Sequence, residues 1–422
     1  MAVVGAGVGG LELVTHLKDV PVDVVLVDAN NFHTFQPLLY QVATAGLDSD
    51  DIASPVRGIV GRQRNVDVRL GRVTGIDVAG RRLLLDDGPP VEYDRLVLAA
   101  GAVTNTFATP GVEEHGFGLK HLSDAVRLRQ HVLRQFERAA VDPSLIDDGV
   151  LNVVIAGGGP TGVELAGGLT ELYRNVLSKD FPTIDVRRAR IILAEPAGVL
   201  LSTFHPKLSE RARRTLAKRG VEMVLGQGVA STDGKAVELT DGTRIPSTTL
   251  VWTAGVRANP LAEVLAEQLG PDTLTRGGRV VVEDDLTVPG HPEIAVVGDL
   301  AAARDRDGDV LPQVAPVAIQ AGRLVARNLA AELEGRPPEA FHYLDKGSMA
   351  TIGRHDAVAQ LPGGLRFSGP LGWVAWLVLH LVMLIGFRNR ANVLVNWAWN
   401  YVTYDRGSRL IVGTDEGPAS PP

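Results

Sequence analysis

The chain has 422 residues, enough for two or three domains, and its hydrophobic content of 45% is enough for sizeable cores. Its net charge of -7 gives no overall basic field, so we expect no nucleic-acid partner. Because the chain has no cysteine, it lacks disulfides, thiolate metal sites and a dithiol redox relay. We expect no metal site, and any electron acceptor must take its electrons from a bound cofactor.

The chain opens with a strand, a glycine-rich turn and a helix. Residues 1–4 are apolar and β-type, and residues 11–17 have a helical pattern. In a GxGxxG turn the first glycine makes the turn, the second admits a pyrophosphate and the third packs helix on strand. The phosphates then meet free N–H groups at the helix start. This motif comprises Gly5, Gly7, Gly9 and Gly10. No signal peptide precedes it, so we expect a cytoplasmic amino-terminal half.

A carboxylate follows this turn at the distance that ribose binding needs. The strand Val24–Asp28 ends 18 residues after Gly10, close to the spacing at which an acid binds the ribose hydroxyls. A solvated acid at a strand end is the alternative. Residues 93–101 then form a buried strand that runs into the small pair Ala100 and Gly101. We place the first part of one dinucleotide-binding domain at 1–118 and a helical connector, with a helix over 121–140, at 119–149.

A second turn of the same type lies 152 residues after the first. A strand over 151–156 and a helix over 163–173 flank it, and two such turns imply two dinucleotides. The strand Ile191–Glu195 ends in an acid 33 residues after the turn, and we attribute the excess length to a helix extension and loop over 178–190. An acid here would repel a 2′-phosphate, which favours NADH over NADPH. The turn comprises Gly157, Gly159 and Gly162.

This second unit spans 150–275 and ends in the strand and small turn 250–255, with Ala254 and Gly255. Small residues at both strand ends would let the two cofactors approach closely. Residues 279–283 and 294–297 are expected strands, the latter leading into Gly298 and Asp299. A helix over 314–333 begins near Pro316. We assign 276–340 to the first domain, which is therefore discontinuous.

The region 341–412 differs in composition. Residues 371–387 carry no charge but fall short of the roughly 20 apolar residues of a spanning helix. In the next segment one face is polar and the other mainly apolar, which predicts an in-plane helix on a lipid bilayer. Core or dimer-interface helices are the alternative, so a homodimer is possible. We expect a disordered tail at 413–422. The polar face comprises Asn392, Asn396, Asn400 and Thr403, the other Val393, Leu394, Trp397, Tyr401 and Tyr404, and the flanking arginines are Arg388, Arg390, Arg406 and Arg409.

With these residues, the chain resembles the type II NADH dehydrogenases, single-subunit flavoproteins that pass electrons from NADH to membrane quinone. The resemblance covers essentially the whole sequence and implies an α/β fold. That fold has two Rossmann-type dinucleotide-binding domains and a C-terminal amphipathic helical membrane-anchoring region. The segments that carry the resemblance are 3–7, 35–43, 159–164, 298–299, 345–353 and 384–390.

The resemblance assigns roles by matching positions. It implies FAD on the first turn and Asp28, with the backbone near Val73 beside the adenine and Asp299 on the ribityl chain. It implies NADH on the second turn and Glu195. A carboxylate at Glu164 would handle protons between flavin and quinone, although a partner of the helix dipole is the alternative. A lysine at Lys346 would lie near the flavin, and a surface lysine is the alternative there.

One departure concerns the quinone. Family members carry two glutamines four residues apart, and here Pro316 replaces the first, which leaves Gln320 to bond a quinone carbonyl. The implied reaction transfers hydride from NADH to FAD and then two electrons to membrane quinone, without proton pumping. The implied place is the respiratory chain at the cytoplasmic face of a bacterial plasma membrane, as a peripheral protein. A soluble NADH-dependent flavin reductase and a redox-dependent scaffold flavoprotein are the alternatives.

Overall fold

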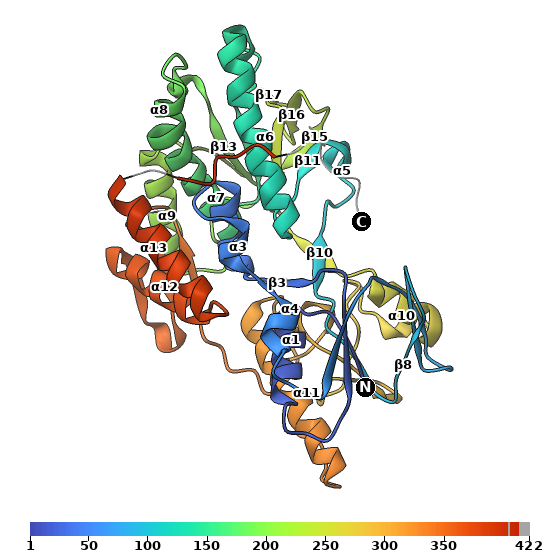
Figure 1. Ribbon diagram of the computed structural model, residues 1–422. Coiled ribbons are helices and arrows are strands. Elements are labelled where there is room, and N and C mark those ends of the chain that lie inside the picture. The colour runs from blue at the N-terminus through green and yellow to red at the C-terminus, as the bar shows by residue number, and fades with distance from the viewer. Residues whose placement is uncertain (404–405, 413–422) are drawn as a thin grey trace. The chain divides into compact units, whose positions relative to one another are not determined.

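The computed structural model describes residues 1–403 and 406–412 (Figure 1). The chain forms two compact units, each built from segments distant in sequence. The first unit comprises 1–34, 53–103 and 256–345, and the second comprises 35–52, 104–255 and 346–422. The expectations for Tyr404 and for the tail 413–422 concern residues outside those described.

The first unit is built on a six-stranded sheet in the order β20-β21-β9-β1-β2-β5. All its neighbours are parallel except β20 and β21. The strands are β1 (Ala2–Val4), β2 (Val24–Asp28), β5 (Val66–Leu70), β9 (Leu96–Leu98), β20 (Thr287–Val288) and β21 (His291–Val296). Helix α1 (Val8–His16) packs against α11 (Ala315–Leu333). Other elements are β3 (Phe32–Thr34), β4 (Ala53–Pro55), α4 (Val56–Val60), β6 (Val73–Asp77), β7 (Arg82–Leu85), β8 (Val91–Glu92), β19 (Val256–Ala258), α10 (Leu261–Leu269) and the 3-10 turns Pro271–Thr273 and Gly298–Leu300.

The second unit has a five-stranded parallel sheet in the order β11-β18-β12-β13-β14. These strands are β11 (Gly116–Phe117), β12 (Val153–Ala156), β13 (Ile191–Glu195), β14 (Glu222–Leu225) and β18 (Thr249–Trp252). Its helices are α2 (Leu39–Ala43), α3 (Ser49–Ile52), α5 (Val112–His115), α6 (Leu122–Val141), α7 (Pro160–Leu172), α8 (Ser178–Asp180) and α9 (Pro206–Lys218). A π-helical turn, Tyr173–Leu177, continues α7, and β15 (Val229–Thr232), β16 (Ala236–Leu239) and β17 (Arg244–Pro246) form a small antiparallel sheet.

The C-terminal part of the second unit adds the antiparallel strands β22 (Ser348–Thr351), β23 (Ala357–Gln360) and β24 (Arg366–Gly369). Helices α12 (Pro370–Met383) and α13 (Phe387–Thr403) follow. Helix α12 ends inside the uncharged stretch 371–387 because Leu384 is extended and Gly386 has a φ of 89°. In the parts of the chain described, no helix has the length and apolarity to cross a bilayer.

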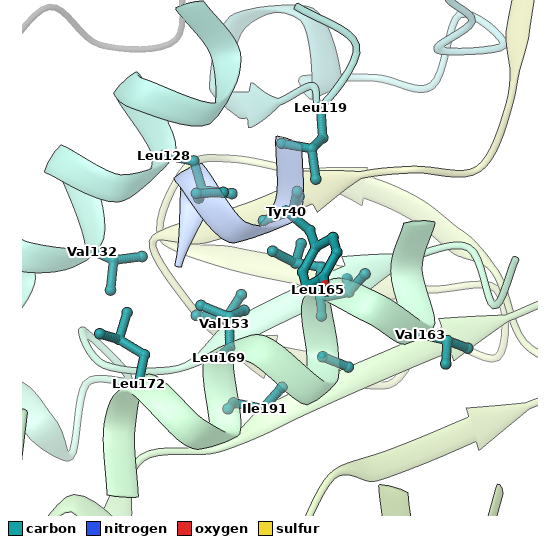
Figure 2. Packing of buried hydrophobic residues seen from close by; sticks show 14 of the residues in the cluster. Tyr40, Leu119, Leu128, Val132, Val153, Val163, Leu165, Leu169, Leu172 and Ile191 are labelled. Atoms are coloured by element: carbon teal, nitrogen blue, oxygen red, sulfur yellow. The ribbon is translucent and has the colours of Figure 1, made fainter. Parts of the chain in front are cut away.

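The core of the second unit explains why α6 and α7 lie where they do. Leu128 and Val132 of α6 and Leu169 of α7 project into one buried cluster (Figure 2). Val153 and Ile191, on the adjacent parallel strands β12 and β13, register directly opposite each other and complete it. The apolar stripes that define each helix in the sequence are therefore the surfaces that fix the helix on the sheet.

Two expectations differ from the structure. Residues 279–283 are not a strand, because Val280 makes only isolated bridges, to Leu274 and Ala301, and the Arg279 side chain instead turns inward to the carbonyls of Leu311 and Ala301. The unit boundaries also differ from those predicted. Residues 35–52 join the second unit, as do the connector 119–149 and the C-terminal region, and the first unit resumes at 256 rather than 276.

Candidate functional site

The first glycine turn has the geometry of a phosphate-binding loop. Gly5 has a φ of 104°, and a Cβ there would lie 2.4 Å from the carbonyl oxygen of Ala99. A Cβ at Gly10 would lie 1.9 Å from the carbonyl oxygen of Gly5. By contrast, nothing lies within 4 Å of a Cβ at Gly7, the residue before the first turn of α1. Open space at the helix start is where a pyrophosphate would approach the backbone.

The second turn repeats this geometry. Gly157 has a φ of 107°, and a Cβ there would lie 2.8 Å from Cα of Ala254. A Cβ at Gly162 would lie 1.9 Å from the carbonyl oxygen of Gly157, and again nothing lies within 4 Å of one at Gly159. In both turns the first glycine has a positive φ, the second leaves open space and the third lies against backbone.

Each turn also holds its acid in the same way. Asp28 accepts from the backbone N–H groups of Ala6, at 2.6 Å, and Asn30, at 2.7 Å. Glu195 accepts from Gly158, at 2.5 Å, and Ala197, at 2.7 Å. In each case one donor lies inside the glycine turn, and the second donor lies two residues after the acid. Both carboxylates are thus fixed beside the loop, where the hydroxyls of a ribose could be bound.

A histidine that the sequence did not indicate braces the first turn. His33 is 5% exposed, and its Nδ1 lies 3.0 Å from the carbonyl oxygen of Ala6. Burial lowers the pKa of His33, against the opposing effects of this hydrogen bond and of Asp28. A neutral imidazole therefore donates to the turn. A single histidine after a strand carries no pattern by which the sequence could have revealed it.

The remaining first-unit candidates surround the carboxyl end of the parallel sheet. Gly101 has a φ of 69° with nothing within 4 Å of a Cβ, and Ala100 precedes it. Asp299 lies in a 3-10 turn after β21, and its carbonyl accepts from the side chain of Gln313 at 3.0 Å. Val73 is 8% exposed at the start of β6. Crevices at this edge of an open α/β sheet are where ligands bind.

The side chain of Gln320 is already engaged inside the first unit. Its Nε2 donates to the carbonyl oxygens of Leu344, at 2.9 Å, and Pro316, at 3.1 Å. Its Oε1 accepts from the backbone N–H of Leu344 at 2.9 Å. The side-chain amide of Gln320 thus both donates to and accepts from the backbone of Leu344. It can donate to a ligand only if it releases the carbonyl oxygen of Leu344 or Pro316.

Glu164 is the most strongly perturbed carboxyl of the candidate residues. Burial raises its pKa to about 8, although the backbone N–H of Thr351 donates to Oε1 at 3.2 Å and opposes the rise. The indole N–H of Trp376 also opposes it, but its geometry does not complete a hydrogen bond. At neutral pH this carboxyl therefore holds a proton, and a neutral acid can donate one.

Next to Glu164 lies a pocket of about 440 Å³ within the second unit, which we call the aromatic pocket. Thr351 and Trp376, both neighbours of Glu164, line it. Its apolar wall comes from Trp373, Val374, Leu377, Val378, Leu381, Leu394 and Trp397, and its polar end from Thr44, Glu171, Arg354, Asn400 and Arg406. Such a pocket suits a flat apolar ligand with a few polar atoms.

A buried ion network closes the polar end of the aromatic pocket. Arg406 is 8% exposed and donates to the carbonyl oxygen of Thr44, at 2.5 Å, and to Glu171, at 3.2 Å. Glu171 also accepts from Arg219, at 2.9 Å, and from the backbone N–H of Arg354. The expectation that Arg406 flanks a lipid surface is therefore wrong, because its guanidinium stabilises the interior.

On a surface helix in water the apolar face packs on the protein and the polar face is exposed. Helix α13 shows the reverse arrangement. Asn396 donates to Asp51 at 2.8 Å, and Asn400 donates to the carbonyl oxygen of Gly46 at 2.9 Å. The predicted polar stripe thus faces protein. Val402, on the other side, is 79% exposed. Among the apolar residues predicted on that side, Val393 is buried and Leu394 is exposed.

Comparison with known proteins decides the family. The family model for pyridine nucleotide-disulphide oxidoreductases matches residues 1–322, and the model for the NDH2 C-terminal domain matches residues 346–403. The type II NADH:quinone oxidoreductase Ndh of Mycobacterium tuberculosis is 42% identical over 97% of this chain and 90% of its own. The chain belongs to the type II NADH:quinone oxidoreductases.

Other relatives agree with this family. The type II NADH:quinone oxidoreductase of Staphylococcus aureus is 31% identical over 86% of this chain and 89% of its own. The fold matches NDH2 from Plasmodium falciparum with a TM-score of 0.89 at 18% identity, over 98% and 99% of the two chains. It also matches the sulfide:quinone oxidoreductase of Aquifex aeolicus with a TM-score of 0.72 at 15% identity, over 100% and 98%.

Family membership confirms the predicted enzyme class and fold of this type II NADH:quinone oxidoreductase, and it disfavours the soluble flavin reductase. The structure divides the candidate residues between the units. The first unit holds Gly5, Gly7, Gly9, Gly10, Asp28, Val73, Ala100, Gly101, Asp299 and Gln320, and the second holds Gly157, Gly159, Gly162, Glu164, Glu195, Ala254, Gly255 and Lys346. Lys346 is exposed and lies two residues before β22.

Proposed function

We propose that this enzyme oxidises NADH and reduces a membrane quinone to the quinol through a bound FAD. The overall reaction takes NADH, a quinone and one proton to NAD⁺ and the quinol. The observation that carries the proposal is the pair of equivalent glycine turns, each completed by a carboxylate that backbone N–H groups hold in place. Two dinucleotides on one chain are what a hydride transfer between a nicotinamide and a flavin requires.

We assign FAD to the first unit. The open backbone at Gly7 fits a pyrophosphate, and Asp28 is oriented for an adenosine ribose. When bound, FAD supplies two-electron redox chemistry that amino-acid side chains lack. Val73 would lie beside the adenine, Asp299 would bind the ribityl chain, and Lys346 would approach the flavin. Ala100 and Gly101 would leave room for close approach of the cofactor.

We assign NADH to the second unit. The open backbone at Gly159 fits its pyrophosphate, and Glu195 is held so that its oxygens face the turn. A 2′-phosphate beside this carboxylate would place two negative charges together, so we propose selectivity for NADH over NADPH. Ala254 and Gly255 would admit the nicotinamide end.

We assign the aromatic pocket to the quinone. Its tryptophan-rich wall suits the ring and tail, and Glu164, protonated at neutral pH, stands behind Trp376 and Thr351 as a proton donor to the reduced product. Of the two hydrogens that the quinol gains, one would originate with the hydride of NADH and the other would be a proton from Glu164, which solvent would then reprotonate. Gln320 remains our candidate for a hydrogen bond to a quinone carbonyl, a role that requires it to release Leu344.

The reversed faces of α13 support attachment to the membrane. Phe387 is 87% exposed and Leu371, at the start of α12, is 74% exposed. Water does not stabilise so many large apolar side chains on one surface, whereas the boundary between headgroups and acyl chains does. We therefore propose a peripheral protein on the cytoplasmic face of a bacterial plasma membrane, with a homodimer as a further possibility.

Stopped-flow spectroscopy tests the proposal in two half-reactions. NADH should bleach the flavin absorbance near 450 nm within milliseconds to seconds, and a short-chain quinone should restore it. Glu164→Gln should slow the second step about 10- to 100-fold and leave the first nearly unchanged, because a glutamine cannot donate a proton. If Glu164→Gln carried out both half-reactions at the wild-type rates, the role of Glu164 would be contradicted. Slow bleaching without reoxidation would instead favour a scaffold flavoprotein.

A further inference from the structure

A second concave surface of the second unit has a chemistry unlike that of the aromatic pocket. It is a groove of about 730 Å³ along α9, which we call the basic groove. Five cationic and two acidic side chains line it, an excess of three positive charges on a chain whose net charge is -7. Its charged lining comprises Lys207, Arg211, Arg214, Lys218, Arg219, Glu210 and Asp356.

Helical periodicity produces the basic groove. The cations at 207, 211, 214 and 218 are spaced by four, three and four residues, so they share one face of α9. The opposite face carries Leu208, Ala212 and Leu216, all buried against the unit. Burial of this apolar stripe fixes the rotation of α9 and turns the cationic stripe outward.

The cations differ in how far the protein itself neutralises them. Asp356 accepts from Arg211 at 2.9 Å, and Glu210 accepts from Arg214 at 2.6 Å. Lys207 and Lys218 are exposed, and within the described ranges no ion pair engages either of them. An anion in the groove would therefore meet two ammonium groups together with arginines already held in position by carboxylates.

The basic groove adjoins the apolar surface of α12. A Cβ at Gly369, the residue before α12, would lie 2.7 Å from Nη2 of Arg211, and Leu371 is exposed two residues later. The hairpin turn that supplies Asp356 also supplies His355, whose ring packs on Trp373 of α12 with centroids 5.3 Å apart. Helices α9 and α12 both pack against β23.

We propose that the basic groove binds the phosphate groups of anionic phospholipids and adds electrostatic attachment to the apolar docking of α12 and α13. The inference rests on the proposed membrane attachment. A phosphodiester carries one negative charge and accepts hydrogen bonds from ammonium and guanidinium groups. The occupant is a bilayer surface, because an exposed apolar face continues directly from the groove.

Vesicle binding of the full-length enzyme separates the two contributions. Neutral phosphatidylcholine vesicles report apolar docking, and vesicles with 30% phosphatidylglycerol add the groove. The Lys207→Gln/Lys218→Gln variant should bind the anionic vesicles roughly 25-fold more weakly at 50 mM NaCl, since each lysine near such a surface contributes about fivefold. Its binding to neutral vesicles should equal that of the wild type. At 300 mM NaCl the difference should shrink to a few-fold, because salt screens exposed charges.

The matched control is Lys18→Gln/Lys235→Gln, which removes the same charge from exposed lysines elsewhere and should bind both vesicle types within about twofold of wild type. Oxidation of NADH by a short-chain quinone in detergent should be unchanged in both variants. An unaffected Lys207→Gln/Lys218→Gln variant, or an equal loss in the control, would overturn the groove proposal. Wild-type protein that binds only anionic vesicles would support the groove and contradict apolar docking.

Discussion

The two glycine turns place a glutamate at the same position, two residues after the last glycine, but the two side chains have opposite surroundings. In the first turn Glu12 pairs with Arg323 of α11, with Nε at 2.6 Å and Nη2 at 2.5 Å from Oε1. In the second turn Glu164 is half-buried beside Trp376, without an acid–base ion pair among the described residues, and desolvation raises its pKa to about 8. The two turns therefore repeat in sequence, but the surroundings of their glutamates differ.

The difference follows from what packs on each helix. Helix α1 is covered by α11, whose Gly322 lies so close that a Cβ there would be 2.3 Å from the carbonyl oxygen of Gly9, and α11 brings an arginine. Helix α7 is covered by β22, and a Cβ at Gly167 would lie 2.7 Å from the carbonyl oxygen of Ile352. Strand β22 supplies a backbone N–H and α12 supplies an indole, and neither element contains a lysine or an arginine.

The largest expected effect comes from the glycines that touch backbone. Gly10→Ala and Gly162→Ala each force a Cβ to 1.9 Å from a carbonyl oxygen, which we expect to cost about 4 kcal/mol or more in local stability. Gly10→Ala should lose its bound flavin, measured by absorbance at 450 nm per protein. Gly162→Ala should keep the flavin and lose NADH binding. Loss of flavin in both variants would show that the turns do not divide the cofactors.

The acids at the strand ends should give the next largest effect. Glu195→Gln removes a charge that two backbone N–H groups hold, and we expect the KM for NADH to rise about 10- to 100-fold. The ratio of kcat/KM for NADH over NADPH should fall with it. Asp28→Asn should instead weaken flavin retention with little change in this ratio. An unchanged preference for NADH in Glu195→Gln would refute its part in selectivity.

The pH dependence of stability should report the protonation of Glu164. A folded-state pKa of about 8, against an ordinary 4.5, means that folding takes up a proton between these values. The free energy of unfolding of the wild type, relative to Glu164→Gln, should therefore fall by about 3 kcal/mol from pH 5 to pH 8 and level off above. Denaturant unfolding at each pH measures this. Curves of the wild type and Glu164→Gln that run parallel over this pH range would contradict a neutral Glu164.

The smallest effect on stability should come from the open glycines. Gly7→Ala and Gly159→Ala add a Cβ where nothing lies within 4 Å, so the unfolding free energy should change by less than about 1 kcal/mol. Their nucleotide affinities should still fall, because the added methyl group occupies the approach of the pyrophosphate. Thermal melts of the protein without NADH, beside NADH titrations, distinguish the two effects.

Much of each turn could be predicted from the sequence because its residues are adjacent along the chain. The strand, the glycines, the following helix and the acid at the end of the next strand recur where local patterns place them. The excess of residues before Glu195 is likewise occupied by the end of α7, its π-helical turn and a loop that contains α8. These features depend on backbone conformation and short-range hydrogen bonds.

Features that depend on distant partners could not be predicted. The stripe of Asn396 and Asn400 has the same periodicity whether it faces water or protein, and only Asp51 and Gly46, some 350 residues earlier, settle the direction. Arg406 likewise looks like a flanking arginine until Glu171 and Thr44 are placed beside it. Neither sequence pattern encodes which surface completes the contact.

The long sequence separation between Arg406 and its partners has a consequence for biosynthesis. The second unit is assembled from 35–52, 104–255 and the residues after 345, and Arg406 satisfies both Glu171 and the carbonyl oxygen of Thr44. During translation Glu171 and Thr44 therefore lack this partner until residue 406 has left the ribosome. A product terminated before residue 406 would leave Glu171 with Arg219 as its guanidinium partner but without Arg406, so the polar end of the aromatic pocket would be incomplete.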